Sequence, residues 1–208
     1  MGDFNNQERI IHVYLGLLPI YILLSLQYEP LFLSILFLML YNFYLIEQDA
    51  NEQQKQDGIK QRLYLRLAMF FLLFINTAFF STGNIASFGS FSLASIYRFT
   101  TKFDPFLMGM FLILKILIPF ILTSTAIYGI AIIWDIAPII VYFISIAFSD
   151  IITIRYFYLI KTQGSWLEMG TSMTQYLIAS LFILVLLMLY GVAKMILKNK
   201  EWRHNKSH

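Results

Sequence analysis

The sequence predicts an all-α protein, a polytopic bundle of about six transmembrane helices. Of its 208 residues, 59% are hydrophobic and only 13% are charged, whereas a soluble domain has about 25% charged residues. The hydrophobic residues fall into six runs, each near the length of about 20 residues that crosses a bilayer. These runs show no period of two, so they are not the strands of a barrel. Helices also satisfy their own backbone hydrogen bonds in lipid.

The predicted spans form a single membrane domain over residues 1–208. Residues Gln27 to Pro30 join the first two spans in a tight hairpin, and Pro30 suits the first turn of the second helix because its missing N–H is not needed there. The second run is short, so a hairpin that dips into the membrane is the alternative to two full crossings. In chain order, the six spans cover residues 10–27, 31–46, 63–80, 106–130, 137–160 and 176–197.

A polar segment, EQDANEQQKQDGIKQR, follows the second span from Glu47 to Arg62. Its side chains are almost all charged or amide groups, which are costly to place in hydrocarbon. We therefore predict that the whole segment is a solvated connector.

A second connector, residues 83–105, combines aromatic and polar side chains. From Ser92 onward its pattern favours an amphipathic helix in the membrane interface, with Arg98 and Lys102 on the water-facing side as candidate lipid-headgroup contacts. The alternative is a lid of aromatic side chains packed between helices. Asp104 and Pro105 end the segment and begin the fourth span.

The distribution of Lys and Arg predicts the orientation, because cytoplasmic loops carry the excess of these residues. With six spans, both termini lie on one side, which carries eight basic residues, against three on the other side. We therefore predict cytosolic termini and a lumenal or external position for residues 83–105. The eight are Arg9, Lys55, Lys60, Arg62, Lys198, Lys200, Arg203 and Lys206, and the three are Arg98, Lys102 and Lys161.

Two ionisable residues lie deep in predicted spans. Lys115 is nine residues after Phe106, about 14 Å from one end, and Asp150 is eleven residues before Lys161, about 16 Å from the same end. An unpaired charge at this depth costs about 2.5–3.5 kcal/mol. We predict that Lys115 and Asp150 pair, either for stability or as part of a cationic groove for a lipid phosphate. Arg155 lies higher and can extend toward the headgroups.

The sequence offers no catalytic or metal-binding set. It has no cysteine, and its three histidines, His12, His204 and His208, show no ligand spacing within a span. The phosphate-loop, G-x-S-x-G and H-E-x-x-H motifs do not occur. We therefore predict no catalytic residues and no cofactor in this chain.

Three consecutive segments resemble a known family. They read GNIASFGSFSLASIYRF, TKFDPFLMGMFLILKILIPF and FSDIITIRYFYLIKTQGSWLEMGTSMTQYLI. They resemble the C-terminal membrane region of the GPI ethanolamine phosphate transferase 1 family, the PIG-N type. The resemblance covers about residues 80–197 and is weaker over 10–80. Its most specific positions are the GNIAS segment, Lys115 and Pro119, and Asp150, Gly164, Ser165 and Trp166.

The resemblance implies a membrane enzyme of the endoplasmic reticulum. Family members transfer phosphoethanolamine from phosphatidylethanolamine to the first mannose of the GPI precursor. Catalysis takes place in a lumenal domain with zinc and a Thr nucleophile, N-terminal to the region that this chain resembles. This chain is therefore expected to anchor that domain and to handle the two lipids, with no nucleic-acid partner. An independent transporter or a non-catalytic membrane scaffold is the alternative.

Overall fold

The described part of the chain is a bundle of α-helices without a β-strand. The computed structural model describes residues 6–25, 28–53, 60–81, 104–160 and 165–197. Within these ranges the all-α prediction is confirmed. The helices are α1 (Asn6–Leu24), α2 (Glu29–Gln53), α3 (Lys60–Ser81), α4 (Pro105–Ile133), α5 (Pro138–Tyr158) and α6 (Trp166–Leu197).

Four of the described helices, α1, α2, α4 and α5, are long and apolar enough to cross a membrane. A shorter apolar stretch, Phe182–Leu197, lies within α6. The prediction of a membrane bundle is thus confirmed, and the count of six spans stays a prediction. With 25 residues, α2 is about 38 Å long at 1.5 Å per residue. Since the hydrocarbon core is about 30 Å thick, this length favours a full crossing over a dipping hairpin.

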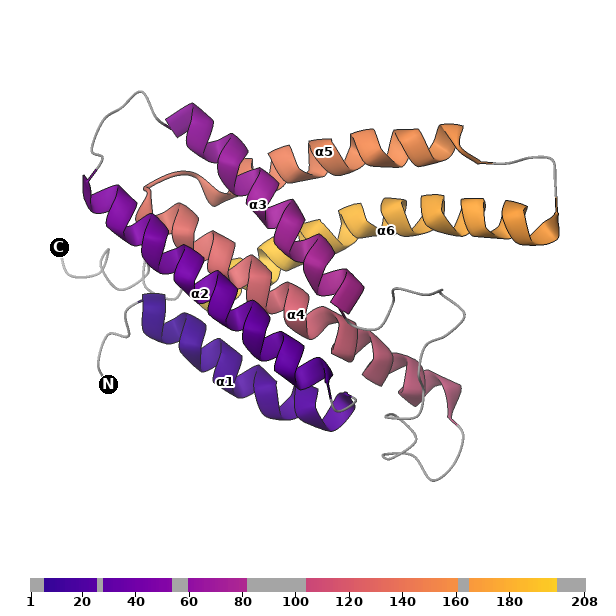
Figure 1. Ribbon diagram of the computed structural model, residues 1–208, viewed down its shortest axis with the longest axis horizontal. Helices are drawn as coiled ribbons and strands as arrows, with labels where there is room; N and C mark the ends of the chain where they lie inside the picture. Colours follow the sequence, from indigo (N-terminus) through magenta and orange to yellow (C-terminus); the bar gives the residue numbers. More distant parts are fainter. Residues whose placement is uncertain (1–5, 26–27, 54–59, 82–103, 161–164, 198–208) are drawn as a thin grey trace.

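The core of the bundle surrounds α4. Figure 1 shows α1 to α4 slanting together, with α5 and α6 running side by side away from them. Among the described helices, α4 contacts every one of the other five. Its residues from Leu122 to Ala131 are all buried. A helix that is apolar on every side suits this central position.

Two contacts of α1 show which helix ends lie together at one end of the bundle. A guanidinium nitrogen of Arg9, in α1, donates to the carbonyl of Leu197, 3.0 Å away at the end of α6. The amide of Gln7 donates to that of Gln48 at 2.8 Å. The first and last helices therefore meet at one end, called here the Arg9 end. The opposite end, where α2 begins, is called the Glu29 end.

The start of α4 follows the prediction from Asp104 and Pro105. The Asp104 carboxylate accepts hydrogen bonds from the backbone N–H groups of Phe106 at 3.0 Å and Leu107 at 3.4 Å. These bonds satisfy two of the N–H groups that a helix leaves without partners at its start. Pro105 occupies the first turn, where no N–H is required.

Two helix boundaries differ from the sequence prediction. The predicted connector from Glu47 is wrong in its first part, because α2 continues to Gln53. Four of the seven residues from Glu47 to Gln53 are Glu or Gln, which are good helix formers, so the helix continues beyond its apolar run. Likewise, α6 begins at Trp166, ten residues before the predicted span. There the hydroxyl of Ser165 accepts from the backbone N–H of Glu168 at 3.3 Å, the start of a Ser-x-x-Glu capping box that the sequence already carries.

Gly129 of α4 faces side chains of α1 and α2. A Cβ atom at this position would lie 3.3 Å from both Ile10 Cδ1 and Tyr44 Cε2. We expect Gly129→Val to lower the free energy of unfolding by about 1–3 kcal/mol, because the added methyl groups overfill the contact. Gly109→Val in the same helix is the control, since a Cβ at Gly109 has open space around it. Thermal unfolding in detergent measures both, and equal losses would contradict the close-approach explanation.

Candidate functional site

Buried charged side chains are the strongest candidates for a specialised role. Among the described residues, Glu29, Glu47 and Lys115 are the charged side chains that are buried. Charged residues inside a membrane domain are costly and therefore face partners rather than lipid. Each of the three has an ion-pair partner.

Lys115 of α4 pairs with Glu29 at the first turn of α2. The Lys115 Nζ lies 2.8 Å from Glu29 Oε2, and the two side chains are only 5% and 2% exposed. The prediction that Lys115 faces the interior is confirmed. The prediction that it pairs with Asp150 is wrong, because Asp150 is exposed on α5.

The arrangement of the helices explains the change of partner. After the turn that follows α4, α5 packs mainly against α6 and α3 and contacts α4 little. Equal depth therefore does not bring Lys115 and Asp150 together. In addition, the first turns of α4 extend beyond the start of α2 (Figure 1). A residue well inside α4, such as Lys115, thus lies level with the first turn of α2 and reaches Glu29.

Glu29 lies in the first turn of α2, close to α1. The N-terminus of a helix carries a partial positive charge, which stabilises an acidic side chain in the first turn. Tyr21 of α1 is also close enough to interact electrostatically with Glu29. The Tyr21 side chain is fully buried, and its hydroxyl has no hydrogen-bond partner in the described part of the chain. Three helices, α1, α2 and α4, therefore meet around one compensated ion pair.

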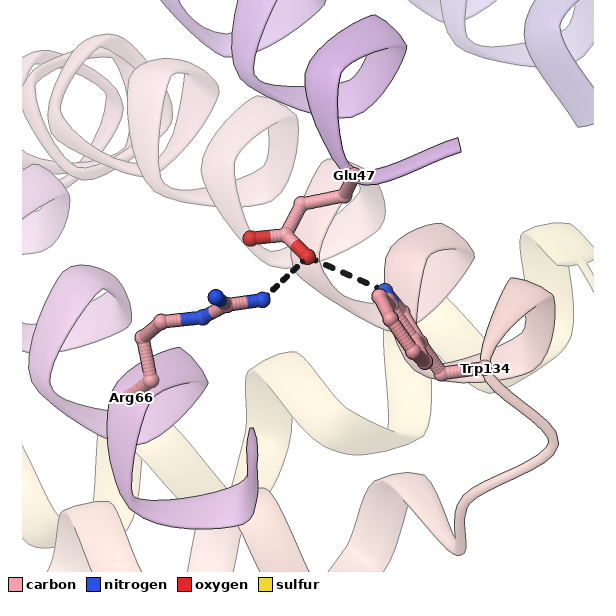
Figure 2. Close-up of polar contacts among 3 residues, drawn as sticks. All are labelled: Glu47, Arg66 and Trp134. Carbon is pink, nitrogen blue, oxygen red and sulfur yellow. Dashed lines mark hydrogen bonds and ion pairs between the residues drawn. The ribbon is translucent and has the colours of Figure 1, made fainter. Parts of the chain in front are cut away.

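A second polar cluster joins α2, α3 and the end of α4 near the Arg9 end. Figure 2 shows that Arg66 and Trp134 converge on one oxygen of Glu47. Arg66 Nη2 lies 2.6 Å from Glu47 Oε2, and the indole Nε1 of Trp134 donates to the same oxygen at 3.0 Å. The Glu47 side chain is 4% exposed and that of Arg66 47%. Because Glu47 follows the second apolar run, its sequence position predicts a solvated connector and gives no sign of this cluster.

Hydroxyl groups join α4, α5 and α6 in the centre of the bundle. The Ser124 hydroxyl donates to the Leu189 carbonyl at 3.1 Å, and the Tyr142 hydroxyl donates to the Ser124 carbonyl at 3.1 Å. All of these polar groups are buried. Interhelical hydrogen bonds of this kind contribute about 0.6 kcal/mol each on average within membranes. They hold the α5–α6 pair against α4.

The other predicted site residues do not join these clusters. Arg155 lies in the last turn of α5 and is exposed, and its extension toward the headgroups stays a prediction. Arg98 and Lys102 lie outside the described residues, together with the predicted amphipathic helix. A lipid-headgroup role for Lys115, Asp150, Arg155, Arg98 and Lys102 stays a prediction.

The described residues do not fit the zinc that the resemblance implies for the catalytic domain. Within the ranges given above, no group of three or more His, Cys, Asp or Glu side chains could hold a metal ion. The two buried carboxylates, Glu29 and Glu47, are each paired with a basic side chain.

Comparisons with known proteins extend the resemblance to most of the chain. Residues 2–165 match the sequence profile of the family described as phosphatidylinositolglycan class N (PIG-N). The human protein named GPI ethanolamine phosphate transferase 1 is 37% identical over 93% of this chain and 23% of its own length. Proteins of the same name are 39% identical in Candida glabrata and 35% in Saccharomyces cerevisiae, over 94% and 92% of this chain and 21% of each relative.

The family profile match includes α1 to α3. Over these helices the resemblance described above is weaker than over residues 80–197. No solved structure is significantly similar to the chain. The chain spans about a fifth of the length of the curated relatives that it matches. Because the profile match covers well over half of its residues, the chain belongs to the phosphatidylinositolglycan class N (PIG-N) family.

Proposed function

We propose that this chain is the membrane part of a phosphoethanolamine transferase of GPI-anchor biosynthesis. The observation that carries the proposal is the family match over residues 2–165, together with the shared name of the curated relatives. In this proposal the complete enzyme transfers phosphoethanolamine from phosphatidylethanolamine to the first mannose of the GPI precursor. It works in the endoplasmic reticulum membrane, with the Arg9 end of the bundle toward the cytosol.

The bundle supplies a rigid base for this reaction. The Lys115–Glu29 ion pair fixes α4 against α2 near the Glu29 end, and the Glu47 cluster fixes α2, α3 and the end of α4 near the Arg9 end. In the proposed orientation, the Glu29 end faces the lumen, where the catalytic domain of the family would lie. The chain then anchors that domain and keeps its two lipid substrates within reach, because both substrates reside in the same membrane.

Complementation of cells that lack this transferase tests the proposal. We expect the chain alone to restore no GPI-anchored protein at the cell surface, since the described residues contain no group of three or more His, Cys, Asp or Glu side chains that could hold a metal ion. Co-expression with a separately supplied lumenal catalytic domain is expected to restore it. Flow cytometry of a GPI-anchored marker, with mass spectrometry of the glycan for phosphoethanolamine on the first mannose, provides the measurement.

Two controls separate anchoring from lipid handling. The first is the catalytic domain alone, and the second is the same domain fused to an unrelated single transmembrane helix. If the unrelated anchor restores the marker as well as this chain does, the chain has no part in lipid handling. Restoration by the chain alone would contradict the assignment of catalysis to another domain.

A further inference from the structure

Asp150 occupies an unusual position on α5. It lies twelve residues after Pro138 and eight before Tyr158, about 18 Å and 12 Å from the two helix ends. Its side chain is exposed, and in the described part of the chain it forms no ion pair or hydrogen bond. The candidate span Pro138–Arg155 includes it, so a carboxylate is presented at the outside of a membrane helix.

Asp150 belongs to a regular stripe of exposed residues. The positions along this stripe are three and four residues apart in strict alternation, the spacing by which one helix packs along another. Apart from Asp150 the stripe is apolar, and Ala147, one turn earlier, is small enough to allow close approach of a second helix. The α5 stripe consists of Ile140, Phe143, Ala147, Asp150, Ile154 and Phe157, all of them exposed.

Neither lipid nor a second copy of this chain suits the α5 stripe. Facing lipid, an acidic side chain within a span disfavours insertion, by a factor on the order of a hundred at the centre of the helix. A second copy related by a two-fold axis would place the same surface on both sides. Asp150 would then face Asp150, and like charges at close range repel each other. A helix with a basic side chain at the same depth neutralises Asp150 and covers the apolar residues.

We propose that the α5 stripe is the docking surface for a membrane-spanning helix from the remainder of the family protein, one that presents Lys or Arg to Asp150. This inference does not rest on the transferase activity, but only on the membrane position of α5. The curated relatives leave about four fifths of their length outside the match, which is ample for such a helix. A single polar pair within an apolar seam also fixes the register of two helices.

Site-specific photocross-linking tests the docking surface. The chain, with a benzophenone amino acid in place of Ala147, is co-expressed with the remaining residues of a full-length relative. Mass spectrometry of the product is expected to identify a peptide from a membrane-spanning segment with Lys or Arg within one turn of the cross-link. The matched control carries the probe at Leu73, an exposed position within α3, and is expected to form lipid adducts.

Charge reversal makes the test specific for Asp150. We expect Asp150→Lys to reduce the cross-linked product about tenfold or more, the factor that 1.4 kcal/mol of lost pairing produces. Replacing the mapped basic residue of the partner by Asp should restore the product. Lipid adducts alone at position 147, a cross-link to a second copy, or a partner peptide without a basic residue would each overturn the proposal.

The stability of the isolated chain provides an independent check. Because Asp150 has no partner within the described residues, Asp150→Leu and Asp150→Asn should leave the thermal unfolding of the purified chain in detergent unchanged or improved. A marked loss of stability in both variants would show that Asp150 is required inside this chain, and the docking proposal would then be wrong.

Discussion

Replacing Lys115 by methionine is expected to lower the free energy of unfolding of the bundle by about 3–5 kcal/mol. Removing one partner of a buried ion pair leaves the other charge without compensation, and losses of about this size follow. Here both side chains are at most 5% exposed, so water cannot replace the missing partner. Methionine keeps the length of the side chain, so the loss reports the charge rather than a cavity. Thermal unfolding of the purified chain in detergent measures it.

Glu29→Met is expected to be at least as damaging as Lys115→Met. Without Lys115, Glu29 still lies at the N-terminus of α2, where the helix dipole stabilises a negative charge. Without Glu29, Lys115 lies in the interior of α4, ten residues after Pro105, and no helix end compensates it. The two substitutions remove the same contact, but we expect them to lower the free energy of unfolding by different amounts.

The double variant separates pairing from mere burial. Glu29→Met combined with Lys115→Met leaves no charge in the contact, and such apolar replacements of a buried pair are often neutral or stabilising. We expect the double variant to be clearly more stable than either single variant. Losses that simply add would show that the two residues act independently, contrary to the 2.8 Å contact.

Arg66→Met is expected to cost about 3 kcal/mol, near the lower limit for breaking a buried pair, because Arg66 is itself half-exposed. The loss comes from Glu47, whose carboxylate stays buried and keeps only the Trp134 indole among the two donors seen in Figure 2. Glu47→Met should cost less. It frees Arg66 to turn toward water and leaves one indole N–H without its acceptor, a penalty of about 1–3 kcal/mol.

Arg66→Lys is the matched control for this cluster. It keeps the positive charge, so most of the stability lost in Arg66→Met should return. Unfolding temperatures in detergent compare the four proteins, wild type included. If Glu47→Met proved more damaging than Arg66→Met, the burial of Glu47 would not be the source of the effect.

The sequence was sufficient for the helices and for the family, but not for the partners of the buried charges. Apolar runs and the Asp104–Pro105 cap are local signals, and each one is borne out by α4. The partner of Lys115 depends on how helices are arranged around α4, which is a matter of packing. The prediction that Lys115 pairs with Asp150 used only their equal depth along the membrane normal. Depth does not say which helices are neighbours, and α5 contacts α4 little.

Glu47 illustrates a different limit of prediction from the sequence. It lies just after an apolar run, and hydropathy alone assigns such a residue to water. Its burial follows from Arg66 and Trp134, two residues far away in the sequence that close over it. By contrast, the early start of α6 was predictable, because Ser165 and Glu168 form the spacing of a capping box.

The central place of α4 has a consequence for how the chain is made. Helices α1, α2 and α3 each contact α4 more extensively than they contact one another, yet all three leave the ribosome first. Glu29 and Lys115 are 86 positions apart, which corresponds to about 4 to 17 seconds of synthesis at 5–20 residues per second. During that interval Glu29 has no Lys115 to pair with. The start of α2 is then expected to stay at the aqueous surface or to be bound by an insertion factor. The contacts of α1, α2 and α3 with α4 then form together, once α4 has been made.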